Sequence, residues 1–224
     1  LHQRRSPRST DSWSRLSEHL LGSGRSMEHV QLPVTYRSTA PILDYANMLL
    51  PQGIRSRTAL RTQGIKPVVL RTTRRRVLGS TMAAAEELCS RYPTGMVAVI
   101  SENPVEVRDH FITQGWQRSS GAKRKLTRNS QAVHVLSPFA ARGLEFDGVV
   151  VHEPIDLRER GGHHGQLYTS LTRANKELRV VHSGALPPEL AAAGEAGLAT
   201  TFASGFSQYS ETQKPTWTPG SPGA

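Results

Sequence analysis

The chain has 224 residues and a formal net charge of +10, because 28 lysines and arginines outnumber 18 acids. This charge favours a polyanionic partner, of which nucleic acid is the commonest, although charge spread evenly for solubility would give the same total. Hydrophobic residues make up only 37% of the chain, so part of it is expected to lie outside a packed core. The single cysteine, Cys89, excludes an intramolecular disulfide and fits a cytoplasmic location, and no apolar run approaches the ~20 residues of a membrane span.

The chain begins at Leu1 without a methionine, which favours a fragment of a longer protein. Residues 1–29 are predicted to be an N-terminal segment with one helix that ends at about Leu21. Beyond them, β-branched runs predict strands, and amphipathic or alanine-rich stretches predict helices. The strands are expected at 30–34, 66–71, 96–100, 132–136, 148–151 and 178–182, and the helices at 41–50, 81–91, 104–114 and 166–176.

This alternation is typical of a single α/β domain with a mostly parallel sheet flanked by helices, which we place at 30–190. Pro41 suits the first turn of its helix, and Asn103 is expected to cap the helix that begins at Pro104. The chain then becomes rich in small and polar residues, and we expect 191–224 to form a disordered tail.

A charged loop lies between the two apolar strands of 132–151. It contains Arg142, Gly143, Glu145 and Asp147. Because ligands of parallel α/β sheets collect outside the carboxyl ends of strands, this loop is the first candidate site. The alternative is a solvated connection that happens to be charged.

Two segments concentrate positive charge. The first, 55–76, has eight cations and no acid, and the second, 115–130, has Lys123, Arg124, Lys125 and Arg128 close to Trp116. Each segment could face phosphates or be a solvated surface. Trp116 could stack on a base or simply belong to the core. The cations of the first segment are Arg55, Arg57, Arg61, Lys66, Arg71, Arg74, Arg75 and Arg76.

Three arginines stand where phosphate chemistry would need them. Arg37 follows a predicted strand, Arg142 lies in the charged loop, and Arg173 lies beside the apolar face of a predicted helix. The guanidinium fork is planar, always charged and able to bind an anion at two points. An arginine close to an apolar face is costly unless it meets an anion, and a structural ion pair would satisfy that need equally well.

Other common sites are missing from the sequence. No G-x-x-x-x-G-K-[ST] motif is present, so the chain has no phosphate-binding loop of its own. Glu153 follows an apolar strand, as a Mg²⁺-binding acid would. This interpretation has little support without a phosphate-binding loop. His152, His163 and His164 lack the spacing of a zinc site, so no metal site is expected, and Cys89 is interpreted as buried filler.

Three segments together resemble UvrD/Rep-type superfamily 1 helicases. Leu32-Pro-Val-Thr-Tyr-Arg-Ser resembles motif IV, Ser137-Pro-Phe-Ala-Ala-Arg-Gly-Leu-Glu-Phe-Asp resembles motif V, and Leu167-Tyr-Thr-Ser-Leu-Thr-Arg-Ala resembles motif VI. Leu1-His-Gln resembles the end of motif III. The resemblance covers roughly residues 1 to 190, and it implies the C-terminal, RecA-like lobe of an ATP-dependent DNA helicase or translocase.

The resemblance also implies roles for individual residues. Arg37 and Arg173 would reach the γ-phosphate of ATP, and Gln3 would sense it. Tyr36 would stack on the adenine and Glu145 would hydrogen-bond the ribose. Ser137, Phe139 and Arg142 would lie near the nucleic-acid strand. Gly143, which follows them, would allow a close approach to the ligand.

Some features depart from the family. Phe139 and Arg142 stand where the family usually has histidine and lysine. The compact spacing between motifs IV and V resembles the helicase IV branch, which includes ATPases that recycle RNA polymerase. ATP, with Mg²⁺ held by a first lobe that bears the phosphate-binding loop, would then be required for activity. Single-stranded or duplex DNA and RNA polymerase are the expected partners, and the alternatives are a non-enzymatic nucleic-acid-binding module or a gene remnant.

Overall fold

The computed structural model describes residues 19–20, 34–55, 58–122, 124–157 and 165–203. Eight strands form one sheet in the order β10-β3-β9-β8-β4-β7-β6-β5. The first six of this order are parallel, and β6 and β5 join the end of the sheet in antiparallel fashion. The bounds are β3 (Val68–Arg71), β4 (Val97–Ile100), β5 (Gln117–Arg118), β6 (Lys125–Arg128), β7 (Gln131–Leu136), β8 (Phe146–His152), β9 (Ala174–His182) and β10 (Thr200–Phe202).

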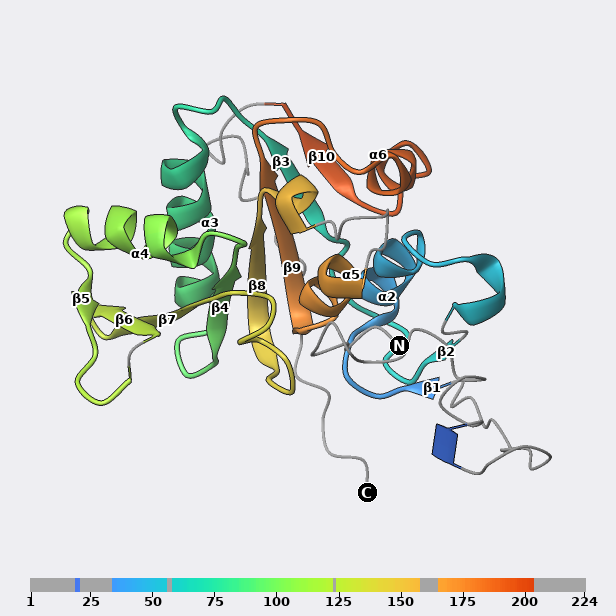
Figure 1. Cartoon of the computed structure of the whole chain (residues 1–224), viewed down its shortest axis with the longest axis horizontal. Coiled ribbons are helices and arrows are strands. Elements are labelled where there is room, and N and C mark those ends of the chain that lie inside the picture. Colours follow the sequence, from blue (N-terminus) through green and yellow to red (C-terminus); the bar gives the residue numbers. More distant parts are fainter. Residues whose placement is uncertain (1–18, 21–33, 56–57, 123, 158–164, 204–224) are drawn as a thin grey trace, which may run out of the picture.

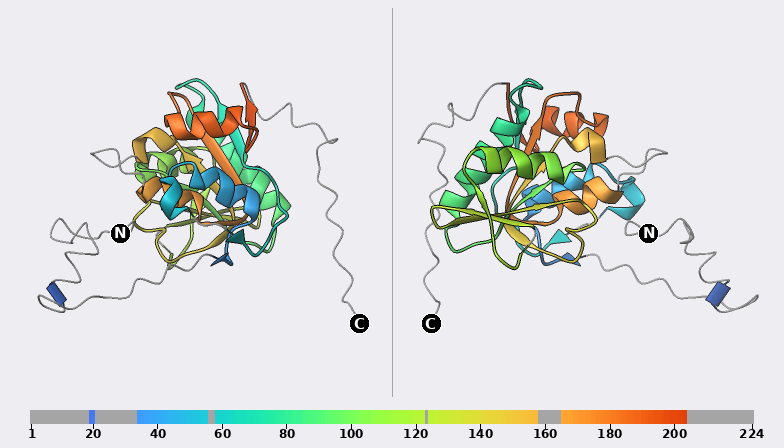
Figure 2. Two further views of the ribbon diagram at one scale, coloured as in Figure 1. Left: turned by 90° about the vertical axis from the view of Figure 1, so that its right-hand side faces the viewer. Right: turned by 60° about the vertical axis from the view of Figure 1, so that its left-hand side comes forward.

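Helices cover both faces of the sheet (Figure 1). One face carries α3 (Val77–Arg91) and α4 (Pro104–Thr113). The opposite face carries α2 (Ala40–Asn47), α5 (Gly165–Leu171) and α6 (Pro188–Glu195), which the left view of Figure 2 brings to the front. A separate two-stranded ribbon pairs β1 (Val34–Thr35) with β2 (Thr58–Ala59), and short 3-10 turns lie at Gln52–Ile54 and Pro154–Leu157.

The central strands are apolar because both of their faces are covered. All four residues of β4 are buried, and so are six of the seven residues of β8. Within β8, Val149 and Val151 pack on the side of α2 and α5, whereas Val150 packs on the side of α3. The predicted α/β fold with a mostly parallel sheet is therefore confirmed. Within the described helices, none is both long and apolar enough to cross a membrane.

Local signals for helices are also confirmed. Asn103 caps α4, with its side-chain oxygen 3.5 Å from the amide nitrogen of Glu106 that donates to it. Pro104 occupies the first turn of α4, and Pro41 does the same in α2. Trp116 is buried in the core and packs edge-on against Phe111, with ring centroids 5.4 Å apart, so its core interpretation is the right one.

Three predictions were wrong. The helix predicted to run to residue 176 ends at Leu171, because Ala174 already pairs with Phe146 in the sheet. The basic segment 115–130, where no strand was expected, contains β5 and β6, and β6 turns into β7 through two residues with positive φ, Asn129 and Ser130. The tail predicted from residue 191 is ordered at first, since α6 and β10 extend the lobe to residue 202, and 204–224 lie outside the described residues.

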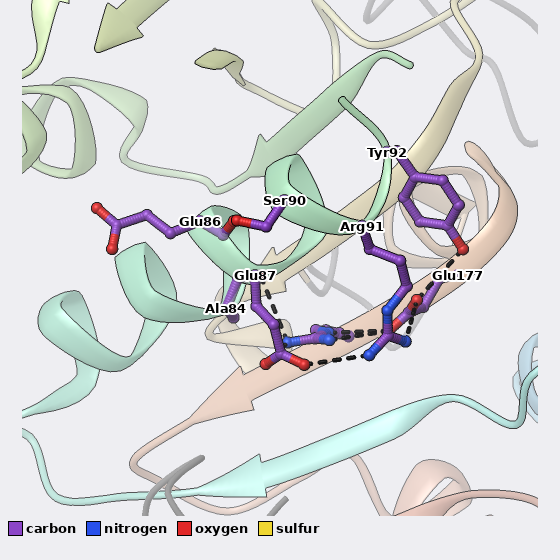
Figure 3. A network of polar contacts seen from close by, with 8 residues as sticks. Ala84, Glu86, Glu87, Ser90, Arg91, Tyr92 and Glu177 are labelled. Carbon is purple, nitrogen blue, oxygen red and sulfur yellow. Dashed lines mark hydrogen bonds and ion pairs between the residues drawn. The ribbon is translucent and has the colours of Figure 1, made fainter. Parts of the chain in front are cut away.

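A cluster of buried charges joins α3 to the middle of the sheet (Figure 3). Glu177 and Arg179 on β9 have fully buried side chains and lie 3.0 Å apart. Arg179 also contacts Glu87 at 2.6 Å, and Arg91 contacts Glu177 at 2.7 Å. The hydroxyl of Tyr92 donates to Glu177 at 3.3 Å. Each buried charge thus has an opposite charge beside it, as burial requires.

Removing Glu177 should therefore destabilise the fold strongly. The variant Glu177→Ala removes the fully buried carboxylate of the cluster and leaves Arg179 and Arg91 to share Glu87. Losses of one partner in a buried pair cost about 3–5 kcal/mol. Urea unfolding should show this drop in the free energy of unfolding. The control is Asp109→Ala, which breaks an exposed pair with Arg118 at 3.8 Å and should cost less than about 1 kcal/mol. Equal losses in the two variants would contradict the role of the buried cluster.

Candidate functional site at the amino edge of the sheet

The motif residues meet at the amino ends of β8 and β9. Glu145 immediately precedes β8, and Arg173 immediately precedes β9. The amide of Phe146 donates to the carbonyl oxygen of Arg173 at 3.0 Å, so the two strand starts lie side by side. The charged loop begins at the carboxyl end of β7, as expected, but its residue Glu145 lies at the opposite, amino edge of the sheet. Because β7 and β8 point the same way, the loop that joins them must return from the carboxyl edge to the amino edge before β8 begins.

Arg173 is fixed by two backbone carbonyls. It lies in the turn between α5 and β9 rather than within a helix, and it is only 5% exposed. Its Nε donates to the carbonyl of Thr169 at 3.0 Å, and its Nη1 donates to the carbonyl of Leu144 at 3.0 Å. Among the described residues no carboxylate lies within ion-pair distance of it. The guanidinium is thus buried and oriented with its charge uncompensated by direct contact.

Two arginine charges lie close together beside one carboxylate. Arg37 forms an ion pair with Glu145, and both side chains are partly exposed. Burial, and then the neighbouring charge of Arg37, lower the pKa of Arg173, while Glu145 raises it. The ion pair and the adjoining strand starts thus place the three side chains in one cluster. The cluster has two positive charges and one negative charge, and this excess suits an anion.

Motif IV is attached to this cluster through Ser38. The hydroxyl of Ser38 is buried and donates to the carbonyl of Ala174 at 2.9 Å. This bond fixes the segment that carries Tyr36 and Arg37 against the start of β9. Tyr36 is 70% exposed, which is unusual for a large aromatic side chain and leaves its ring available for stacking. The structure therefore brings together Arg37, Glu145 and Arg173, and Tyr36 directly precedes Arg37 in the chain.

The residues expected to contact nucleic acid form a helical turn after β7. The hydroxyl of Ser137 accepts the amide of Ala140 at 3.2 Å, so it stabilises the turn itself. Phe139 is 60% exposed, and the guanidinium of Arg142 lies 5.1 Å from its ring centroid. Gly143 has a φ of 78°, a conformation that other residues rarely adopt, so its backbone requires glycine. Gln3 lies outside the described residues.

One ion pair beside the site has no counterpart in the sequence predictions. Asp147 contacts Lys176 at 2.8 Å and also accepts the amide of Met96 at 2.8 Å. Lys176 in turn lies 5.4 Å from the ring centroid of Tyr92. The pair joins β8 to β9 close to Glu145 and Arg173. Only the pairing of the two strands reveals it, because Asp147 and Lys176 are far apart in sequence.

Two further sequence interpretations concern isolated groups. The carboxylate of Glu153 accepts the backbone amide of Ser183 at 3.1 Å and also its hydroxyl, so it is engaged within the protein. In the described part of the chain, histidine, cysteine and acidic side chains nowhere gather in a group of three that could hold a metal ion. Cys89 is buried, and burial raises the pKa of its thiol to about 11, consistent with a packing role.

The Asp147–Lys176 pair makes stability depend on acid pH. Burial alone would raise the pKa of Asp147, but hydrogen bonds from Lys176 and Met96 outweigh it and lower the pKa below its ordinary value. Its contribution is present above the unfolded pKa of ~3.9 and is lost as pH falls through the lower folded pKa. Asp147→Asn should therefore unfold more easily than the parent at neutral pH and flatten the loss of stability below about pH 4. Urea titrations at several pH values would test this, and an unchanged profile would contradict it.

Two comparisons link this geometry to known proteins. Residues 132–181 match the family model of the UvrD-like helicase C-terminal domain, a range that contains both Glu145 and Arg173. The chain is also similar to the crystal structure of the C-terminal domain of a possible DNA helicase from Lactobacillus plantarum WCFS1. That match has a TM-score of 0.57 and 27% identity, and it covers 75% of this chain and 98% of the other. None of the curated proteins matches the chain. The segment that contains Glu145 and Arg173 is thus similar in sequence to UvrD-like helicase C-terminal domains, and the fold is similar to that of the C-terminal domain of a possible DNA helicase.

Proposed function

We propose that the lobe is the second RecA-like lobe of an ATP-driven superfamily 1 motor that moves on DNA. One observation carries the proposal, namely the paired arginine charges at the amino edge of the sheet. A buried arginine and a half-exposed arginine lie there beside a single carboxylate, which pairs directly with the half-exposed one. Phosphoryl transfer needs such cations where negative charge develops in the transition state.

The nucleotide would lie along this edge against a first lobe that supplies the phosphate-binding loop and holds Mg²⁺. Arg173 and Arg37 would contact the γ-phosphate, and the exposed ring of Tyr36 would cover the adenine. Glu145 would exchange its ion pair with Arg37 for a hydrogen bond to the ribose. Gln3 is assigned to γ-phosphate sensing by the family resemblance alone.

A DNA strand would contact the turn at Phe139 and Arg142. An exposed aromatic ring beside a guanidinium is a stacking surface for bases that also attracts phosphates. Phenylalanine can stack as the histidine usual in the family would, and Arg142 keeps the positive charge of the usual lysine. Ser137, whose hydroxyl holds the turn, would orient these two side chains.

RNA polymerase is a second candidate partner. The described chain between motif IV and motif V consists of elements of the lobe itself, from α2 to β7, and has no additional subdomain. This compactness favours the helicase IV branch, in which some ATPases recycle RNA polymerase. Co-purification of core RNA polymerase with the intact protein, weakened by ATP, would support that role, and absence of any complex would favour DNA as the sole track.

The affinity for ATP and the affinity for DNA should depend on different aromatic residues. Tyr36→Ala is expected to weaken ATP binding without changing the affinity for single-stranded DNA. Phe139→Ala, the matched control, should weaken DNA binding by the ~1–3 kcal/mol of one stacked base and leave ATP binding unchanged. NMR titration with ATP and fluorescence anisotropy with a labelled oligonucleotide would measure the two affinities. If neither variant affected either ligand, the proposed function would fail.

Turnover should depend on Arg173. In a protein that joins this lobe to its first lobe, Arg173→Ala should lower the rate of ATP hydrolysis on the order of a thousandfold, as with other arginine fingers. Thermal unfolding should accompany the assay, because the side chain also binds two backbone carbonyls. A folded variant that loses less than about tenfold in rate would exclude the catalytic role.

A further inference from the structure

The basic segment 55–76 separates into two groups of cations in the folded chain. Three of its cations donate to backbone carbonyls of the lobe itself. Arg55 binds the carbonyl of Leu50 at 2.9 Å, Arg61 that of Asn175 at 3.2 Å and Lys66 that of Gly197 at 2.8 Å. These three therefore hold loops in place, and Arg57 lies outside the described residues.

The other four cations, Arg71, Arg74, Arg75 and Arg76, form what we call the arginine turn. All four are exposed. Arg71 ends β3, and the three consecutive arginines form the turn that leads into α3. Within the described chain, no carboxylate lies within ion-pair distance of any of the four, and their side chains make no hydrogen bond. The arginine turn thus presents four guanidinium groups to solvent within six residues of sequence.

This arrangement is unfavourable for the fold alone. Arg76 occupies the N-cap position of α3 without a capping hydrogen bond, and the first turn of α3 has no acid. A helix N-terminus carries partial positive charge, so cations there repel it, and an anion would relieve the repulsion. Since the four arginines are exposed and have no ion pair with the residues that the structure describes, a contribution to stability does not explain them.

The second basic segment differs in this respect. Arg128 pairs with Glu86 and lies 5.0 Å from the ring centroid of Trp116, and Arg118 pairs with Asp109. Among the described acids, Asp156 interacts electrostatically with the arginine turn through Arg74. Burial and Glu153 raise the pKa of Asp156, and Arg74 lowers it, without an ion pair between Arg74 and Asp156. Four adjacent exposed arginines without an ion pair in the described chain therefore distinguish the arginine turn from the second segment, in which Arg118 and Arg128 are paired.

We propose that the arginine turn binds the phosphates of a nucleic-acid strand. Arginine forks match phosphate geometry at two points, and several adjacent forks match the repeating charge of a nucleic-acid backbone better than a single small anion. The turn follows β3, whereas Ser137 and Phe139 follow β7 at the same carboxyl edge, four strands away. At ~4.8 Å per strand this separation is roughly 19 Å.

The two contacts are separate sites on one edge. Glu102, Glu153 and Asp156 follow β4 and β8 between them, and their negative charges would not bind phosphates. A strand of nucleic acid that reaches both sites would span about five to six phosphates at ~3.4 Å each along one strand of a duplex. The proposal goes beyond the nucleotide site and holds whether or not ATP is bound.

The test compares two double variants of the whole chain that remove equal charge. Arg75→Gln/Arg76→Gln removes half of the arginine turn, and Arg118→Gln/Arg124→Gln removes two exposed arginines near β5 and β6. Fluorescence anisotropy with a labelled oligothymidylate of about 20 nucleotides would be recorded from ~50 to ~200 mM salt. The first variant should reduce the slope of log K against log salt by ~1.4 and weaken binding about 25-fold near ~0.1 M salt, because each contact to single-stranded nucleic acid contributes ~0.7 to the slope.

The control variant should keep the slope of the parent. Arg75→Gln/Arg76→Gln should also unfold at the same or a higher temperature, since it relieves repulsion at the start of α3. An unchanged slope in this variant, or equal losses in both variants, would overturn the proposal. If Arg75→Gln/Arg76→Gln retained DNA binding but lost binding to polyglutamate, the proposal would be overturned, and an acidic protein would be the partner of the arginine turn. Phe139→Ala distinguishes failure of this proposal from failure of the proposed function. If only that variant lost DNA binding, the proposed function would stand and the arginine turn would have no part in DNA binding.

Discussion

The pairing of β8 with β9 is the constraint on which the candidate site depends. The two strands are the longest of the sheet and lie at its centre, and Phe146 pairs with Ala174 at their amino ends. This register places Glu145 and Arg173, each one residue before its strand, next to each other. The site therefore derives its geometry from backbone hydrogen bonds in the most deeply buried part of the lobe, and its loops need only complete it.

The charges buried on β9 help to fix that register. Along the strand, Glu177 and Arg179 point to the side of α3, whereas Leu178 and Val180 pack with the residues of the opposite face. A shift of the strand by one residue would exchange the two faces. It would bury Glu177 and Arg179 among apolar side chains without partners, at a cost far above that of a lost contact. The network in Figure 3 thus makes alternative pairings of the same strand unfavourable.

The sequence was informative where one local rule decided the outcome. Apolar β-branched runs located β4 and β8, and Asn103 with Pro104 located the start of α4. Arg37, Glu145 and Arg173 were identified from three separate motifs, and the fold brings these three together.

Where tertiary pairing decided the outcome, the sequence was misleading. Leu171 and Ala174 have helical spacing, yet Ala174 is the first residue of β9 because the start of β8 is available to pair with it. The hairpin of β5 and β6 is polar and charged, and the pairing of β6 with β7 and the burial of Leu126 in the core favour strands there. The location of the site at the amino edge follows from the direction of β7 and β8 within the sheet, which periodicity cannot show.

The attachment of Arg173 has a mechanical consequence. Its guanidinium is held by Thr169 at the end of α5 and by Leu144 just before β8, whereas Arg37 is half exposed and held by a single ion pair. Arg173 is therefore a rigid part of the lobe and pays little conformational entropy on meeting a ligand. A rigid group moves as far as its support moves, and displacements of ~1 Å can change reaction rates about a hundredfold. In the proposed motor, small rotations of the lobe would thus move the guanidinium of Arg173 by the same amount and change the rate of hydrolysis directly.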